Sequence, residues 1–226
     1  MCIVADDMLV SIEEFPEHEI ISGIIIAHVC GGQLHCGIAY KSEGQANALH
    51  LAWHYDLRDQ PAQSLYSHGY YFTLPSIDII RQRVIAAKCR RISRAKEQEI
   101  PYGLLYEGAT FDNDGILRLG GNEHGLTCAT FVMAVYASCG ITLCDYDAWP
   151  ARQEDGTWHD FIIDLLRQHR VPQEHLHNLG QKIGCARFRP EEVAASITFP
   201  DLPAPVDKIW EKGVLIRQRL IHLIGA

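Results

Sequence analysis

The sequence has no long apolar run, no excess of positive charge and no closely paired cysteines. Its longest uncharged stretch, residues 125–144, is interrupted by Gly140 and diluted by serine and threonine. It therefore falls short of the roughly 20 apolar residues that a membrane span requires. Lysine and arginine number 20 against 28 aspartate and glutamate residues, giving a formal charge of −8. This balance argues against general attraction to nucleic acid or anionic membranes.

Features of a secreted protein are also missing. The eight cysteines form no CxxC motif, and the first ten residues lack a basic stretch and include Asp6 and Asp7. A secretory signal begins with a basic segment, and small extracellular proteins depend on cysteine pairs. We therefore expect reduced thiols and a cytoplasmic location.

The composition that is present is typical of a globular protein. Of the 226 residues, 47% are hydrophobic and 21% are charged, and this length predicts a single domain spanning residues 1–226. Short β-branched or alternating runs predict strands, and apolar residues at helical spacing predict helices. Expected strands cover residues 22–29, 33–40 and 47–55, and expected helices begin at residue 76 and cover residues 128–139, 158–168, 190–196 and 206–223.

The first expected helix has one apolar stripe and one basic face. Ser76 is its predicted N-cap, with Asp78 in the first turn. The predicted buried stripe consists of Ile77, Ile80, Val84 and Ala87 or Cys89, and the basic side chains between residues 81 and 96 lie opposite. We interpret this basic face as a solvated surface rather than as a nucleic-acid site.

A cysteine opens the most apolar of the expected helices. Cys128 follows Thr127, a residue type that caps helices, and it begins a face of large apolar side chains at helical spacing. Unpaired N–H groups in the first turn favour a thiolate and can stabilise an oxyanion. Cys128 is therefore a candidate nucleophile, although free cysteine is also common as a buried packing residue.

Two expected strands place histidines on a common face. A hairpin that turns at Glu43 and Gly44 sets Gly37 opposite His50, with His35 diagonal to both His50 and His54. The remaining positions on that face are glycine and alanine, so we expect the cysteine helix to pack there. Each histidine is alternatively a hydrogen-bonded core residue, and a zinc site formed by His50 and His54 is a rival interpretation.

These segments resemble a known family. The block His35-Cys-Gly-Ile-Ala-Tyr40, followed by Ala48-Leu-His50, is similar to the histidine hairpin of circularly permuted papain-like cysteine hydrolases. That group includes the YiiX-type permuted relatives of NlpC peptidases and the lecithin:retinol acyltransferases. Its chain order is histidine first and nucleophilic cysteine later, as here. The segment Ile100-Pro-Tyr-Gly103 ahead of Cys128 also resembles the family, while the tyrosine of the hairpin is displaced by one position.

The resemblance implies an α+β, permuted papain-like fold in which a small antiparallel sheet packs on a buried cysteine-bearing helix. Its core covers about residues 20–150, and residues 151–226 add C-terminal helices that shape a cleft or an oligomer interface. The implied site has Cys128 as nucleophile, His35 as base and His50 as third residue. His54 competes with His50, and Asn122 is a weaker oxyanion candidate.

The implied activity is that of a cysteine-dependent amidase or peptidase that forms an acyl-enzyme on a peptide or amide substrate. An acyltransferase or thioesterase on the same fold and a catalytically dead binding module are the alternatives. No cofactor, metal or nucleic-acid partner is expected, and a homo-oligomer is left open. The residues alone support a Cys–His site; the choice of substrate depends on the resemblance.

Overall fold

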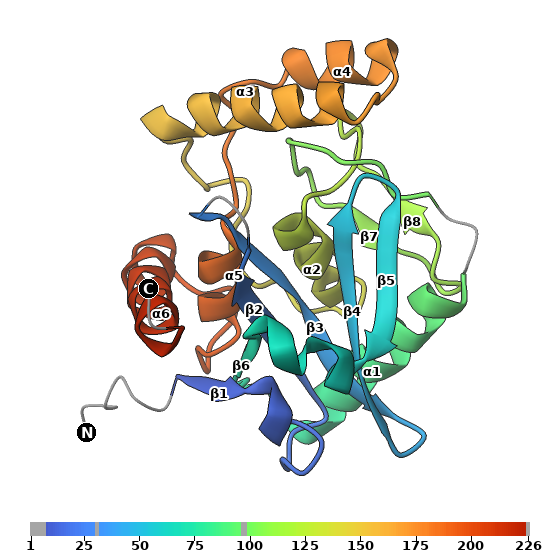
Figure 1. The fold of residues 1–226 in the computed structure, drawn as a ribbon, viewed down its shortest axis with the longest axis vertical. Coiled ribbons are helices and arrows are strands. Elements are labelled where there is room, and N and C mark those ends of the chain that lie inside the picture. The colour runs from blue at the N-terminus through green and yellow to red at the C-terminus, as the bar shows by residue number, and fades with distance from the viewer. Residues whose placement is uncertain (1–7, 30–31, 96–98, 225–226) are drawn as a thin grey trace.

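The computed structural model describes residues 8–29, 32–95 and 99–224. Its architecture is α+β, with an antiparallel sheet flanked by helices (Figure 1). Cys2, Cys30 and Lys96, which entered the arguments on cysteines and on the basic face, lie outside the described residues. No helix within the described ranges is both long enough and apolar enough to cross a membrane.

The main sheet has six strands in the order β1-β6-β2-β3-β4-β5. The three strands expected from the sequence are confirmed as β2, β3 and β4, with small shifts at their ends, whereas β1, β5 and β6 were not predicted. A separate two-stranded sheet pairs β7 with β8. The bounds are β1 (Leu9–Ser11), β2 (Ser22–His28), β3 (Leu34–Ser42), β4 (Gln45–Trp53), β5 (Asp56–Pro61), β6 (Tyr71–Thr73), β7 (Thr110–Phe111) and β8 (Leu117–Arg118).

The β3–β4 hairpin has the predicted register. Glu43 and Gly44 both have positive φ, 53° and 76°, which is the backbone conformation that a two-residue hairpin turn requires. The ladder pairs Ala39 with Ala48 and Ile38 with Leu49. Because side chains alternate along a strand, this register places the histidines and the small residues of both strands on one face.

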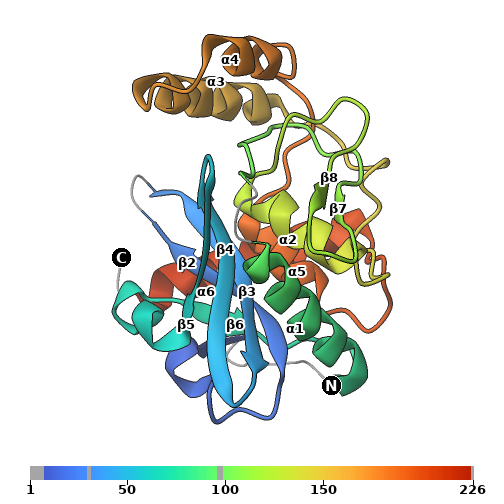
Figure 2. The same cartoon turned by 90° about the vertical axis from the view of Figure 1, so that its right-hand side faces the viewer.

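The cysteine helix packs on the opposite face from the one expected. The helix α2 (Cys128–Ala137) joins a core cluster with Cys36, Ile38, Leu49 and Leu51, the large side chains of β3 and β4. The small-residue face is covered by two 3-10 helices, Ile12–Glu14 and Ala62–His68. An apolar helix buries more surface against large side chains than against glycine and alanine. In Figure 2 the helices α1, α2 and α5 lie together on one side of the sheet.

The helix α1 (Ile79–Arg94) begins later than predicted and turns a different face inward. Its N-cap is Asp78, whose carboxylate accepts the N–H groups of Ile80 and Arg81 at 2.9 Å, and not Ser76. Ile80 and Val84, predicted as buried, are 69% and 47% exposed. Ile77 and Cys89, two positions of the predicted stripe, are buried, and the buried side chains of α1 other than Cys89 are Gln82, Ile85, Ala86 and Ile92. The apolar pattern did not identify this face of α1, because one of its buried positions holds a glutamine, Gln82. Its side-chain oxygen accepts the N–H of Ile21, and its side-chain nitrogen donates to the carbonyl of Ile77.

The C-terminal helices serve two different parts of the fold. The helices α5 (Pro190–Ser196) and α6 (Val206–Leu223), both confirmed with their predicted bounds, contribute residues such as Ala194 and Ile209 to the main core. The helices α3 (Gln153–Gln168) and α4 (Gln173–Gly180) form a separate layer at one end of the molecule (Figure 1). α3 starts earlier than predicted, and α4 was not predicted because only Leu176 and Leu179 are buried in it.

Candidate active site

The first turn of α2 is held by two threonines. The Thr127 hydroxyl accepts the N–H of Thr130 at 3.1 Å, and the Thr130 hydroxyl accepts the N–H of Thr127 at 2.8 Å. This reciprocal cap makes Cys128 the first residue of the helix, as predicted. The N–H groups of Cys128 and Ala129 make no hydrogen bond within the described part of the chain. They lie at the positive end of the helix dipole.

The Cys128 thiol lies close enough to Cys36 and to the His35 imidazole for both to act on its pKa. A hydrogen bond from the Cys36 thiol is the main cause that lowers the pKa of Cys128 well below its usual value. Burial acts in the opposite direction, and the charge and hydrogen bond of His35 lower the pKa further, so that Cys36 and His35 together outweigh burial. Burial raises the pKa of Cys36, so Cys128 is the thiol of this pair that ionises.

The other thiols with a resolved pKa shift all move the opposite way. Burial raises the pKa of Cys139 and of Cys185 to about 11 and the pKa of Cys144 to about 12. Burial also raises the pKa of Cys89. Cys128 is therefore the thiol among the described residues that ionises most readily, and the thiolate is the reactive form of cysteine.

His35 links Cys128 to His50. The Nε2 atom of His35 lies 2.8 Å from the Nδ1 atom of His50, with the ring centroids 5.0 Å apart. His35 is 9% exposed and His50 is 3% exposed. Because Nε2 of His35 is engaged by His50, Nδ1 is the ring nitrogen left to serve Cys128. The predicted proximity of His35 to Cys128, and of His50 to His35, is confirmed.

His50 is a neutral acceptor in this arrangement. Burial, followed by the proximity of His35 and Arg58, lowers the pKa of His50 to about 3, so His50 carries no charge at neutral pH. A neutral imidazole whose Nδ1 is unprotonated can accept a hydrogen bond from an imidazolium on His35. The remaining nitrogen, Nε2 of His50, is buried without a hydrogen-bond partner in the described residues.

Gly37 makes room for the His50 backbone to approach β3. A Cβ atom at this position would lie 2.5 Å from the Cβ atom of His50 and 2.9 Å from the carbonyl oxygen of Leu49. Distances this short force either the side chain or the strand to move. Gly37 is therefore the residue that allows the two histidine-bearing strands to pair at this point.

Replacing Gly37 with alanine should separate His50 from His35. We expect a loss of about 1–3 kcal/mol in the free energy of unfolding and a shift of the alkylation pH profile of Cys128 toward higher pH. Gly180→Ala is the matched control, because a Cβ atom at Gly180 meets nothing within 4 Å. Urea unfolding and iodoacetamide labelling measure the two effects. A Gly37→Ala protein that matches wild type in both would contradict this interpretation.

His54 does not compete for the third position. Its Nδ1 atom accepts the N–H of Tyr102 at 3.0 Å, and its ring packs against Tyr55 and His175. Burial and the proximity of His175 lower the pKa of His54 to about 4. The strand β4 ends at Trp53, so His54 leaves the face that carries His50. The sequence had predicted that both histidines share one face, which is wrong because the strand ends before His54.

His50 and His54 thus bind separate partners and do not form a pair of metal ligands. Within residues 8–29, 32–95 and 99–224, no group of three or more histidine, cysteine, aspartate or glutamate side chains is placed to hold a metal ion. The zinc interpretation therefore has no ligand set among the described residues.

Asn122 lies in a surface turn and not beside the thiol. Its backbone N–H donates to the Glu107 carboxylate at 2.9 Å, and its side-chain amide donates to the same carboxylate. The neighbouring Glu123 accepts the N–H groups of Glu107, Ala109 and Gly120, which closes the turn. The oxyanion role suggested for Asn122 has no support, because its amide is engaged by Glu107 and Asn122 is not among the residues that line the cavity at Cys128.

Tyr102 lines the same cavity as Cys128, in a segment held against the start of α2. Leu126 donates its N–H to the carbonyl of Pro101 at 2.9 Å, and Gly103 donates to the carbonyl of Leu126 at 3.2 Å. A side chain at Gly103 would collide with the backbone of Gly125. Burial, followed by the charge of Cys128, raises the pKa of Tyr102, so its hydroxyl stays protonated.

A cavity of about 280 Å³ opens beside Cys128 and His35. Side chains of β3, β4, α2 and α3 and of the segment before α5 line it, and most of them are apolar. The polar side chains that line it are Gln33, His35, Tyr102, Thr127 and Arg187. Sequence reasoning did not find Arg187, because nothing in its local pattern distinguishes it from the neighbouring Arg189.

No protein-family model, no curated protein and no solved structure matches this chain. The chemistry of the site is therefore inferred from its own geometry.

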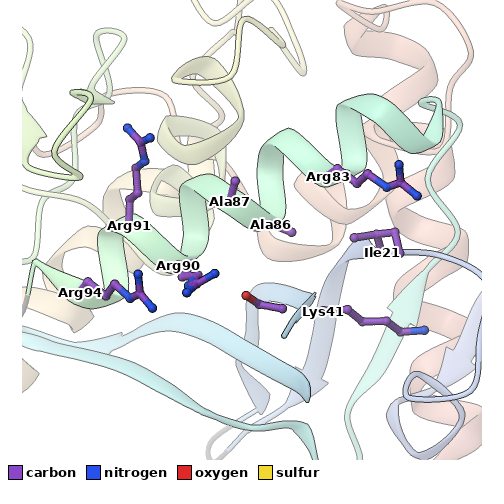
Figure 3. A pocket seen from close by; sticks show the side chains of 9 residues that line it. Ile21, Lys41, Arg83, Ala86, Ala87, Arg90, Arg91 and Arg94 are labelled. Atoms are coloured by element: carbon purple, nitrogen blue, oxygen red, sulfur yellow. The ribbon is translucent and has the colours of Figure 1, made fainter. Parts of the chain in front are cut away.

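A second hollow, of about 400 Å³, lies between α1, the residue before β2 and the last two residues of β3 (Figure 3). Arg83, Arg90 and Arg94 project from α1 around it, with Lys41 opposite. Arg90 forms an ion pair with Glu43, and the Lys41 ammonium donates to the carbonyl of His18. No cysteine, histidine, serine nucleophile with a base, or carboxylate pair lines this hollow, so the candidate active site is the cavity at Cys128.

Proposed function

We propose that this protein is a cysteine-dependent hydrolase of peptide or amide bonds. Cys128 is the nucleophile, His35 is the general base and acid, and His50 orients His35. The observation that carries the proposal is the contact chain from the Cys128 thiol through His35 to His50, with 2.8 Å between the two imidazoles. A nucleophile, a base and an orienting group in contact are the arrangement that covalent catalysis by cysteine requires.

The reaction begins with transfer of the Cys128 proton to Nδ1 of His35. The thiolate attacks the substrate carbonyl carbon, a C–S bond forms, and negative charge develops on the carbonyl oxygen. The free N–H groups of Cys128 and Ala129 and the Tyr102 hydroxyl are the donors available to that oxygen. The imidazolium of His35 then protonates the leaving nitrogen as the C–N bond breaks.

Water completes the cycle. His35 takes a proton from water as the water oxygen attacks the thioester carbonyl, and the C–S bond breaks to release a carboxylic acid and regenerate Cys128 with its proton. His50 accepts a hydrogen bond from Nε2 of His35 whenever His35 is an imidazolium. That bond holds the ring in position and stabilises its charge, as a third residue does in related triads.

The apolar lining of the cavity favours a second candidate function. A thioester buried among side chains such as Leu34, Trp53 and Phe161 is shielded from water. If an alcohol or amine acceptor enters in place of water, it takes the acyl group from Cys128, and the protein acts as an acyltransferase. If the substrate is a thioester, the same reaction with water makes the protein a thioesterase. A binding module without catalysis is the remaining alternative, and it predicts no unusually reactive thiol.

The proposal extends to the fold family and to the location. The order His35, His50, Cys128 along the chain and the cysteine at the start of a buried helix support a permuted papain-like arrangement. A thiol nucleophile in contact with a second thiol, Cys36, is best kept reduced in the cytoplasm.

Labelling with iodoacetamide tests the proposal before any substrate is known. At about pH 6, where ordinary thiols are almost fully protonated, we expect Cys128 to be alkylated at least tenfold faster than each of the other seven cysteines. Peptide mapping by mass spectrometry gives the rate for each site. Uniformly slow labelling would favour the binding module, and a Cys128 among the slowest thiols would exclude catalysis by this residue.

A further inference from the structure

Arg187 is a cation without a counter-ion in the wall of the candidate active site. It lies in the segment before α5 and lines the cavity beside Cys128. Its guanidinium covers the ring of Trp158, with Cζ 3.7 Å from the ring centroid. Its side chain forms no hydrogen bond or ion pair within the described ranges, and its Nε atom is buried without a partner.

The neighbouring arginines, unlike Arg187, form ion pairs with carboxylates. Arg152 forms an ion pair with Glu192, and Arg189 forms one with Glu154 at 2.6 Å. The buried carboxylate of Asp155 lies within 4 Å of both Arg152 and Arg189. Its Oδ2 atom accepts the backbone N–H of Arg152 at 2.9 Å and the backbone N–H of Arg187 at 3.3 Å. Glu191, which also acts on the pKa of Arg187, forms an ion pair with Arg217 at 3.1 Å. The acidic side chains of this region are thus engaged by other arginines.

A half-buried guanidinium without an anion is costly. Burial, followed by the charge of Arg189, lowers the pKa of Arg187 to about 10, so Arg187 is still charged at neutral pH. The Trp158 ring satisfies one face of the guanidinium through a cation–π contact but accepts none of its in-plane N–H groups. An anionic group with two oxygens would satisfy those donors, and inside an apolar cavity such a pair is stronger than at the surface.

The other walls of the cavity limit which chemical group can be attached to that anion. Its walls are aromatic and aliphatic, including Trp53, Phe161 and Phe188, and its volume is about 280 Å³. This lining suits an apolar side chain of one residue rather than a polar or extended group. Tyr102 links the two ends of the cavity, because the charges of Cys128 and Arg187 both act on its hydroxyl.

We propose that Arg187 binds a carboxylate of the substrate, so that the site takes a group in which a free carboxylate adjoins an apolar side chain, as at the C-terminus of a peptide or in an N-acyl amino acid. Arg187 is a specificity-determining residue in this proposal. The reaction that follows rests on the proposed cysteine hydrolase function, whereas the binding of the carboxylate does not.

Binding to a Cys128→Ser protein tests recognition without turnover. The probes are N-acetyl-phenylalanine and its neutral amide, N-acetyl-phenylalaninamide, which differ only in the carboxylate. Tryptophan fluorescence reports binding, since Trp53 and Trp158 line the cavity. We expect the acid to bind at least about tenfold more tightly than the amide.

Two variants, each of which removes one positive charge, distinguish binding of the carboxylate by Arg187 from a general effect of the net charge. Arg187→Gln should abolish the preference for the acid, whereas Arg83→Gln, an exposed arginine of α1, should keep it. Arg187→Gln should also leave the thermal midpoint unchanged or raise it, because it removes a charge that has no partner. A large fall in that midpoint would show that Arg187 is a structural residue and would overturn the proposal.

Other results decide the proposal as well. Equal affinities for acid and amide, including no binding of either at millimolar concentration, overturn it, as does an acid preference that persists in Arg187→Gln. Binding of inorganic phosphate in place of the acid also overturns it. If Arg187-dependent binding of the acid is found but Cys128 shows no special reactivity, the proposed hydrolase function fails while this inference stands.

Discussion

Replacing His35 with alanine should slow iodoacetamide labelling of Cys128 at about pH 6 by about a hundredfold. In the wild-type protein, Cys36 and His35 lower the pKa of Cys128, and the thiolate is present at any pH above that lowered value. Without His35, less opposes the effect of burial, and the pKa of Cys128 rises. The thiolate is then lost as the pH falls through a higher pKa, and each pH unit below it costs about tenfold in rate.

The measurement is the pH profile of the labelling rate between about pH 5 and pH 9. The midpoint should move to higher pH in His35→Ala, and the two proteins should converge at alkaline pH, where both thiols are ionised. His175→Ala is the control, because the Nε2–H of His175 donates to the carbonyl of Tyr102 at 2.8 Å and His175 does not line the cavity at Cys128. A His35→Ala profile that overlays the wild-type profile would remove His35 as the base.

Replacing His50 with alanine should reduce turnover at least tenfold once a substrate is in hand, and His54→Ala should reduce it less. His50 is the residue that contacts Nε2 of His35, at 2.8 Å. Removal of this acceptor leaves the His35 imidazolium with one hydrogen bond fewer and frees its ring to rotate. His54 instead fixes the backbone of Tyr102 at 3.0 Å, so its loss disturbs the cavity wall rather than the proton transfer.

The alkylation profile of Cys128 distinguishes these two roles without a substrate. His50→Ala should move the midpoint of the profile, while His54→Ala should leave the midpoint in place. His50→Gln is the informative companion variant, because its amide can accept the hydrogen bond and restore part of the wild-type profile. A shift in His54→Ala combined with no shift in His50→Ala would reverse the assignment.

Several features of the site follow from local sequence. The register of the β3–β4 hairpin follows from Glu43 and Gly44, because a two-residue turn with positive φ admits few other pairings. The position of Cys128 at the start of a helix follows from Thr127 and from the apolar spacing after it. These features depend on residues close together in the chain, so the sequence alone predicts them.

Other features depend on which surfaces meet, and periodicity does not contain that information. It showed that β3 has one small and one large face, but only the packed structure decided that α2 covers the large face. Likewise, the choice of His50 over His54 depended on where β4 ends. The inward face of α1 includes Gln82 because the backbone at Ile21 and Ile77 supplies hydrogen-bond partners from outside the helix.

What the sequence by itself determined is therefore a cysteine at a helix start and the register of a histidine-bearing hairpin. Only the tertiary structure brought Cys36 and Arg187 to the same cavity as Cys128. Cys36 reaches Cys128 because α2 packs on the strand face that carries Cys36. Arg187 is left unpaired because the carboxylates near it are engaged by Arg152 and Arg189. Such a competition among charges far apart in the chain exists only once the chain is folded.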